Sequence, residues 1–248
     1  MPGSDVAEWV TSNLGWTPDA TQRRVLNSKT RRGILNCTRQ WGKSTVAAAM
    51  ALYAALMHPM CDVLVVSPTL RQSALLVRIV RRYVRFLGGT PKKDPDSEVS
   101  VLLSNHSRIV GLPSDAGNIR GFSAPQLILV DEAAWMRDEV YQAVRPMLAT
   151  NDGALWLLST PYGQNGFFYN AWTSPRQTWE KYQVTAADCP RIRKDYLEEE
   201  REALGAEQYA QEYCCEFVQR KDDAWDMTAV QGRVSTALAP LVLPASKW

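Results

Sequence analysis

Residues 33–45 of the chain read Gly-Ile-Leu-Asn-Cys-Thr-Arg-Gln-Trp-Gly-Lys-Ser-Thr, and this stretch decides the fold. The apolar residues 33–37 predict a short buried strand, and the alanine-rich segment 44–57 predicts a buried helix. The loop between them ends in Gly42-Lys43-Ser44. Such a loop binds nucleoside phosphates, because its backbone N–H groups and the positive end of the next helix point at the anion. The stretch therefore predicts a nucleotide-binding α/β domain.

Individual residues of this phosphate loop have predicted roles. We expect Lys43 to lie along the β and γ phosphates and the Ser44 hydroxyl to hold Mg²⁺. The first position of the usual Gly-x-x-x-x-Gly-Lys-Ser/Thr pattern is Cys37 here. A chance Gly-Lys-Ser in a turn is the alternative, which the flanking strand and helix disfavour. The further residues expected to contact the nucleotide are Arg39, Gln40, Trp41, Gly42 and Thr45.

A second motif follows at residues 125–133, Pro-Gln-Leu-Ile-Leu-Val-Asp-Glu-Ala. A continuous apolar run suits a parallel strand covered on both faces, and ligands collect at the carboxyl ends of such strands. Asp131 would then hold Mg²⁺, and Glu132 would polarise the attacking water as a general base. The alternative is an acidic pair that only starts the next helix. The order of the two motifs favours the functional interpretation.

A third apolar run, residues 153–158, ends in Ser159-Thr160-Pro161. Hydroxyl side chains at a strand tip can respond to the γ phosphate and pass that state to the next segment. A plain strand-ending turn is an equally good interpretation on local grounds, because these residues are common in turns.

Composition fits one α/β domain of 248 residues, of which 46% are hydrophobic and 22% charged. No apolar run is long enough to span a membrane, and the first residues lack the features of a leader peptide. Five cysteines without framework spacing predict reduced thiols in a cytosol, and two histidines far from any cysteine pair disfavour zinc.

The net charge of +2 does not by itself indicate a nucleic-acid partner. The segment 70–87 predicts an amphipathic helix whose apolar face comprises Leu76, Ile79, Val80, Tyr83, Val84 and Leu87. Its other face carries a basic stripe of Arg71, Arg78, Arg82 and Arg85. Such a stripe can contact DNA phosphates, although an ordinary solvated helix face explains it as well.

The remaining pattern alternates strands with helices, which predicts a doubly wound, mostly parallel sheet with helices on both faces. We expect a hairpin from residues 99–103 and 108–112, and a helical pair broken at Gly205. The other expected strands span residues 62–67, 178–185 and 214–218, and the other expected helices span 5–14, 138–148 and 167–172, with a further helix starting near Pro18.

Together these motifs resemble the ATPase domain of the large terminase subunit, the viral motor that packages DNA. The resemblance covers residues 10–225 and rests on the phosphate loop, the acidic strand tip and the Ser-Thr-Pro motif. It also rests on Asn118-Ile119-Arg120-Gly121-Phe122 and on Glu212-Tyr213-Cys214-Cys215-Glu216-Phe217. It implies a P-loop NTPase fold of the RecA/ASCE type, with ATP and Mg²⁺ as cofactors and a small C-terminal lid subdomain. Members of the family often lack the first glycine.

Further residue roles follow from the resemblance alone. Gln22 matches the glutamine that reads the adenine edge. Arg39 matches a residue that senses the γ phosphate or pairs with Glu132. Arg120 matches the arginine offered to a neighbouring subunit's ATP, although a loop arginine paired with a local carboxylate is the alternative. Ser159 and Thr160 match the motif that couples hydrolysis to lid movement.

The resemblance also implies a domain plan, with an ATPase core at residues 1–187, a lid at 188–230 and a tail at 231–248. Large terminases continue into a nuclease with clustered metal-binding aspartates. We interpret Asp222, Asp223 and Asp226 as lid or linker residues and not as a metal site, so nuclease activity is not expected. The implied function is Mg²⁺-dependent ATP hydrolysis that drives double-stranded DNA into a procapsid.

The implied partners are double-stranded DNA, a viral portal, a small terminase subunit and further copies of the chain in a ring, with no membrane. The implied location is the host cytoplasm, outside the mature virion. Two alternatives remain, a helicase-like nucleic-acid-dependent ATPase and a non-catalytic DNA- or portal-binding assembly protein.

Overall fold

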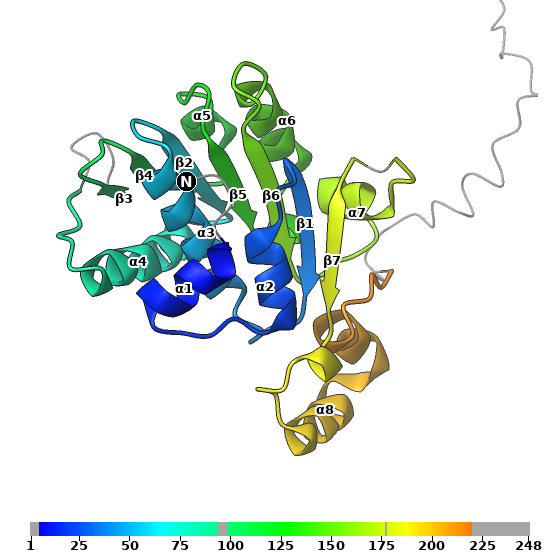
Figure 1. The fold of residues 1–248 in the computed structure, drawn as a ribbon. Helices are drawn as coiled ribbons and strands as arrows, with labels where there is room; N and C mark the ends of the chain where they lie inside the picture. Colours follow the sequence, from blue (N-terminus) through cyan, green and yellow to red (C-terminus); the bar gives the residue numbers. More distant parts are fainter. Residues whose placement is uncertain (1–4, 94–98, 177, 220–248) are drawn as a thin grey trace, which may run out of the picture. The chain divides into compact units, whose positions relative to one another are not determined.

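The computed structural model describes residues 5–93, 99–176 and 178–219, and its centre is one seven-stranded sheet with the order β3-β4-β2-β5-β6-β1-β7 (Figure 1). All neighbouring strands are parallel except the antiparallel pair β3 and β4, which confirms the predicted hairpin. The strands are β1 (Arg32–Cys37), β2 (Asp62–Ser67), β3 (Ser100–Leu102), β4 (Arg108–Pro113), β5 (Leu127–Asp131), β6 (Ala154–Ser159) and β7 (Glu180–Val184).

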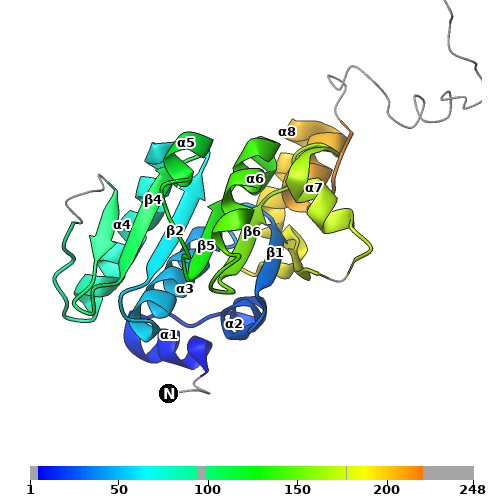
Figure 2. The same ribbon diagram turned by 90° about the horizontal axis from the view of Figure 1, so that it is seen from above.

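Helices cover both faces of the sheet, as Figure 2 shows. The helices α1 (Val6–Leu14), α2 (Ala20–Asn27), α3 (Lys43–Met57) and α4 (Leu70–Phe86) lie over one face. The other face carries α5 (Ala116–Ile119), α6 (Asp138–Met147) and α7 (Gly166–Thr173). Two short 3-10 turns, η1 (Ala133–Trp135) and η2 (Ala186–Asp188), follow β5 and β7.

Two hydrophobic cores result from this arrangement, one on each face of the sheet. Successive strand residues alternate between them: Val63 and Val65 of β2 belong to the core with α3 and α4, whereas Leu64 belongs to the core with α6. Because both faces are covered, the interior positions of the central strands are mostly apolar, and every residue of β5 is buried, including Asp131 at its end. This confirms the predicted doubly wound sheet.

Strand order brings the three predicted motifs to one edge of the sheet. β6 lies between β1 and β5, with Asn36 opposite Ser159 and Leu158 opposite Asp131. The carboxyl ends of these three parallel strands therefore meet, and the segments that follow them lie close together.

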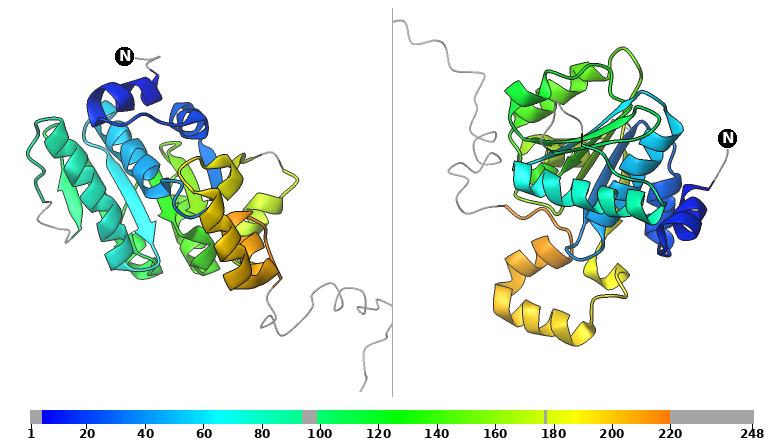
Figure 3. Two further views of the ribbon diagram at one scale, coloured as in Figure 1. Left: turned by 90° about the horizontal axis from the view of Figure 1, so that it is seen from below. Right: turned by 90° about the vertical axis from the view of Figure 1, so that its left-hand side faces the viewer.

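The C-terminal helix α8 (Lys194–Tyr213) lies outside the sheet layers (Figure 3). It is interrupted at Gly205, whose φ of 75° and ψ of 168° are not helical, which confirms the predicted break. Helix α4 ends at Phe86, and Leu87, expected on its apolar face, is 37% exposed.

The strand predicted at residues 214–218 is wrong. Cys215 has a left-handed φ of 58°, which an extended strand cannot accommodate. Side chains hold this segment instead: the Asn36 amide donates to the Cys215 carbonyl at 2.9 Å, and the Cys215 thiol donates to the Val184 carbonyl at 3.1 Å. It therefore contacts the ends of β1 and β7 without extending the sheet.

Among the residues that the structure describes, no helix combines the length and apolarity needed to cross a membrane. No group of three or more His, Cys, Asp or Glu side chains that could hold a metal ion occurs there either. The five cysteines are free thiols. The acidic residues 222, 223 and 226 lie outside the described residues, and the predicted domain boundaries stay predictions.

Candidate nucleotide-binding site

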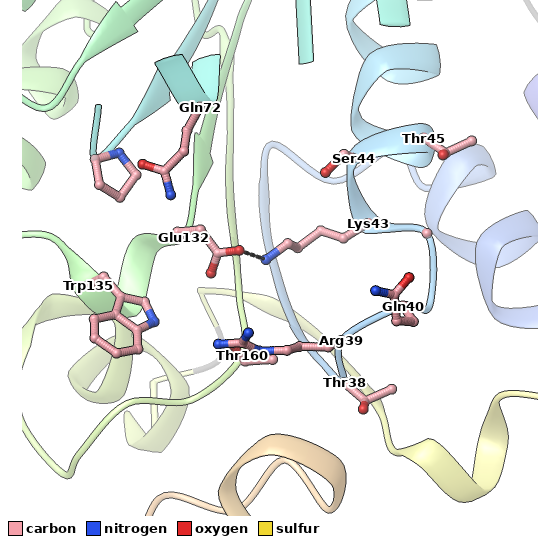
Figure 4. Close-up of a pocket in the computed structure, with 12 residues that line it drawn as sticks. Thr38, Arg39, Gln40, Lys43, Ser44, Thr45, Gln72, Glu132, Trp135 and Thr160 are labelled. Atoms are coloured by element: carbon pink, nitrogen blue, oxygen red, sulfur yellow. Dashed lines mark hydrogen bonds and ion pairs between the residues drawn. The ribbon is translucent and has the colours of Figure 1, made fainter. Parts of the chain in front are cut away.

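A cleft of about 560 Å³ opens at the carboxyl ends of β1, β5 and β6 (Figure 4). It therefore lies at the edge of the sheet where ligands of parallel α/β folds collect. Its lining residues are Thr38, Arg39, Gln40, Gly42, Lys43, Ser44, Thr45, Pro68, Gln72, Glu132, Trp135 and Thr160. The cleft thus unites the phosphate loop with residues that follow β2, β5 and β6.

The backbone of the phosphate loop is shaped for an anion. Gln40 and Gly42 have left-handed φ angles of 63° and 102°, so the chain turns sharply before α3. No side chain caps the start of α3 at Lys43. Because the N–H groups of a first helical turn have no partner within the helix, they remain available to a bound phosphate.

Lys43 connects this loop to the acidic strand tip. Its Nζ lies 2.7 Å from Glu132 Oε1 and 3.6 Å from Asp131 Oδ1. Burial alone would lower the Lys43 pKa, but the two carboxylates outweigh burial, and the pKa lies above its ordinary value. Lys43 is therefore a fixed positive charge in the cleft.

Asp131 provides a carboxylate suited to a metal ion. The residue is 7% exposed, and its Oδ1 accepts no hydrogen bond in the described structure. Burial raises the Asp131 pKa above 3.8, while the Lys43 ammonium opposes the shift. A buried carboxylate oxygen without a hydrogen-bond donor fits Mg²⁺, which prefers oxygen ligands. Asp131 itself does not line the cleft, whereas Ser44 and the neighbouring Glu132 do.

Glu132 is held in a strained backbone conformation with φ 55° and ψ 42°. A non-glycine residue in this region costs about 1–3 kcal/mol, and such strain gathers at functional sites. Its second carboxylate oxygen accepts a hydrogen bond from Ser159 Oγ at 3.5 Å, and Ser159 Oγ accepts from the Ala134 N–H at 3.2 Å. The tips of β5 and β6 are therefore joined at the carboxylate.

Ser159 is fully buried and does not line the cleft, whereas Thr160, 4% exposed, does. The two predicted coupling residues thus occupy different places, one behind Glu132 and one on the cleft wall. Their coupling role stays a prediction.

Two residues predicted to contact the nucleotide, Gln22 and Trp41, are buried beneath the phosphate loop and do not line the cleft. Gln22 is 3% exposed and Trp41 is 1% exposed. The Gln22 side-chain oxygen accepts from the Asp19 N–H at 3.0 Å, and its amide donates to the Trp41 carbonyl at 3.0 Å. Both ends of the carboxamide are therefore engaged, and its adenine-reading role stays a prediction.

Arg39 lines the cleft. One of its two predicted roles was to pair with Glu132, and the structure does not show that pair. The Arg39 Nε lies 2.6 Å from Glu212 Oε2, at the end of α8, while Glu132 pairs with Lys43. The Thr38 hydroxyl also donates to the Glu212 carbonyl at 3.0 Å. The loop is thus tied to the C-terminal helix at two neighbouring residues.

The other predicted arginines lie outside the cleft. Arg120, after α5, is exposed and does not line it. The basic stripe of α4 is at least partly exposed along its length, and Arg82 lies 5.9 Å from the centre of the Tyr83 ring. The trans role of Arg120 and the DNA contacts of Arg71, Arg78, Arg82 and Arg85 stay predictions.

Sequence reasoning missed four residues that line the cleft, Thr38, Pro68, Gln72 and Trp135. Trp135 stacks on Tyr162 with ring centroids 3.4 Å apart, which joins the segments after β5 and β6. For Gln72 the sequence offered only the Thr69-x-x-Gln72 capping pattern, which marks the start of α4 and does not indicate a ligand contact.

The chain belongs to the large terminase subunits. The family model for "Terminase large subunit, T4likevirus-type, N-terminal" matches residues 34–231. The terminase large subunit of Thermus virus P23-45 is 24% identical over 247 residues, covering 86% of this chain and 51% of the relative. That of Escherichia phage T5 is 26% identical over 219 residues, covering 84% and 50%. The chain thus spans about half the length of these curated relatives.

Solved structures show the same fold. The ATPase domain of the Thermus phage P74-26 large terminase superposes with a TM-score of 0.73 at 22% identity, covering 87% of this chain and 100% of that domain. The HK97 bacteriophage large terminase gives 0.71 at 15% identity, covering 87% and 55%. The large terminase of a thermophilic bacteriophage, in complex with ADP, gives 0.69 at 14% identity, covering 80% and 53%.

Proposed function

We propose that the chain is the ATPase part of a large terminase, which hydrolyses ATP with Mg²⁺ to drive double-stranded DNA into a procapsid. The observation that carries this proposal is the contact of Lys43 with two carboxylates, Glu132 on the cleft wall and the buried Asp131 next to it. Lys43 and Asp131 lie 131 − 43 = 88 residues apart in sequence. Together with Glu132 they provide a cation for the phosphates, a carboxylate for the metal ion and a carboxylate for the attacking water, which are the groups that phosphoryl transfer needs. Complexes of the thermophilic bacteriophage terminase with ADP and with ATP-γ-S, on the same fold, support it.

The side chains divide the chemistry between them. Lys43 and the start of α3 hold the phosphate chain, and Ser44 with Asp131 would hold Mg²⁺. When bound, the metal ion neutralises charge that develops on the transferred phosphoryl group. Glu132 accepts a proton from the attacking water, for which it must leave Lys43 as the phosphates take over the ammonium.

The partners and the place of action that we propose rest on family membership, and the proposed role of Arg120 also rests on its exposed position. We assign double-stranded DNA, a portal, a small terminase subunit and neighbouring copies of the chain as partners, with Arg120 offered to a neighbour's nucleotide. The place of action is the cytoplasm of the infected host. The lid at residues 188–230 would transmit the nucleotide state through Ser159 and Thr160.

The test measures ATP hydrolysis by the chain with Mg²⁺ and with excess chelator. Glu132→Gln should lower kcat by about 10²–10⁴-fold, the usual contribution of a general base, and leave ATP bound. Lys43→Ala should abolish binding as well. Glu139→Gln is the matched control, because Glu139 is an exposed glutamate on α6 outside the cleft. Equal rates for all four proteins would leave only a non-catalytic assembly role.

A further inference from the structure

A side-chain amide donor faces the cleft from the wall opposite the phosphate loop. We propose that Gln72 binds the terminal phosphate of the nucleoside triphosphate through Nε2 and thereby distinguishes a triphosphate from a diphosphate. The inference rests on the proposed nucleotide function and adds to it a residue selective for the γ position.

The start of α4 fixes the orientation of this carboxamide. Gln72 Oε1 accepts hydrogen bonds from the Thr69 N–H at 3.1 Å and from the Thr69 hydroxyl at 2.9 Å. In return the Thr69 hydroxyl accepts from the Gln72 N–H at 3.3 Å, which completes a capping box. Because a backbone N–H can only donate, the atom turned toward Thr69 is the oxygen, and Nε2 is the free end.

The topology places that free end in the nucleotide cleft. β2 pairs with β5 in parallel register, with Val66 opposite Val130, so the segments that follow the two strands are neighbours. One continues through Pro68 to Gln72, and the other continues through Asp131 to Glu132. Gln72 and Glu132 both line the cleft, and in Figure 4 the Glu132 carboxylate reaches Lys43 while the Gln72 amide nitrogen is on the side of its carboxamide that faces Glu132.

The part of the Gln72 carboxamide that Thr69 does not engage, the Nε2 amino group, is suited to bind an anion. With Oε1 occupied, the group presents only N–H donors, and within the described residues Nε2 donates no hydrogen bond. A donor suits a phosphate oxygen, whereas Glu132 beside it supplies the acceptor that an attacking water requires. Lys43 and the start of α3 hold the phosphate chain from the other side, whereas Gln72 lies near Glu132, the proposed base for the water that attacks the terminal phosphate. Gln72 therefore matches the terminal phosphate.

Calorimetric titration of the full chain with ATPγS and with ADP, both with Mg²⁺, tests the inference. Gln72→Ala should weaken ATPγS binding about tenfold, the value of one hydrogen bond to a charged group, and leave ADP binding within about twofold. Gln72→Glu is the sharper variant, because a glutamate at this position keeps the capping box but turns a carboxylate toward the phosphate. It should weaken ATPγS binding more than Gln72→Ala does and again spare ADP.

Leu75→Ala is the control, since Leu75 lies one turn further along α4, is 49% exposed and does not line the cleft. Unchanged ATPγS affinity in both Gln72 variants, or equal losses for ATPγS and ADP, would overturn the assignment. If the unaltered chain bound neither nucleotide, the proposed function itself would fail, and this result is distinct from a failure of Gln72 alone.

Discussion

The ammonium group of Lys43 lies between two carboxylates at the carboxyl ends of the strands. Removing this charge should lower the free energy of unfolding of the nucleotide-free protein. Lys43→Met keeps an unbranched apolar stem but removes the ammonium that lies 2.7 Å from Glu132 and 3.6 Å from Asp131. Asp131 is only 7% exposed and cannot exchange the lost partner for water. The variant therefore leaves a buried carboxylate without compensation.

Removing one partner of a buried ion pair costs about 3–5 kcal/mol. The Glu132 side chain is 30% exposed and can turn toward solvent, so we expect a loss at the lower end, about 3 kcal/mol. For a domain of this size each kcal/mol corresponds to about 2–4 °C, which predicts a melting midpoint lower by about 6–12 °C. Lys43→Met combined with Asp131→Asn should recover most of the loss, because the uncompensated charge is gone.

Thermal melts between pH 5 and pH 8 provide the assay. Burial raises the Asp131 pKa above 3.8, the value expected for the unfolded chain, and Lys43 opposes that rise. A carboxyl group whose pKa is higher in the folded than in the unfolded state has no destabilising effect at a pH below both pKa values. As the pH rises from the unfolded-state pKa to the folded-state pKa, the group destabilises the fold increasingly. Without Lys43 the pKa rises further, so the loss of stability should be larger at pH 8 than at pH 5.

Lys194→Met is the control, because Lys194 is exposed at the start of α8. The reasoning is refuted if Lys43→Met and the unaltered protein melt alike at pH 8. A deficit that stays constant across the pH range would also refute it, since the deficit would then come from packing.

Two further predictions concern the frame around the cleft. Glu212→Ala should change the free energy of unfolding by no more than about 1 kcal/mol, because the Arg39 side chain of the pair is 62% exposed. It should nevertheless speed amide exchange at the end of α8, which hydrogen-exchange mass spectrometry detects, and unchanged exchange there would count against the tether. Gly33→Ala would place a methyl group 2.4 Å from the Trp156 ring, and such overpacking costs about 1–3 kcal/mol in a melt. Gly121→Ala, with nothing within 4 Å, should melt within about 0.5 kcal/mol of the unaltered protein; similar losses in both would contradict the packing argument.

Strands and motifs with local signals were predictable from the sequence. The apolar runs before the phosphate loop, before Asp131 and before Ser159 are strands β1, β5 and β6, because a strand buried on both faces needs uninterrupted apolar residues. The order of a parallel sheet then dictates that their carboxyl ends share one edge. The meeting of Lys43 with the acidic tip followed from these two rules.

Long-range partners were not predictable. The segment 214–218 carries residues with good strand propensity, yet hydrogen bonds from Asn36 and Gln183 to the Cys215 carbonyl fix a left-handed turn instead. Strand propensity reflects the residue type and its local sequence. It does not take account of a hydrogen-bonding side chain 179 residues away. The pairing of Arg39 with Glu212 instead of Glu132 was hidden for the same reason.

Gln72 shows a different limit. Its capping pattern was readable, but a capping box indicates only where a helix starts. That the helix starts beside a nucleotide cleft depends on β2 lying next to β5, which the sequence does not specify. Residues such as Gln72 become functional candidates only once the strand order is known.

Contacts before the start of α8 and at its end join the phosphate loop to this helix at two places. Before the helix, Arg191 donates to the Trp41 carbonyl and to Asp19 Oδ2. At its end, Glu212 holds Arg39. Trp41 and Arg39 are two residues apart in the loop, so a displacement of the loop acts on both ends of α8 together. We expect a helix held at both ends to follow the loop as a unit, with any bending at Gly205, whose backbone is not helical.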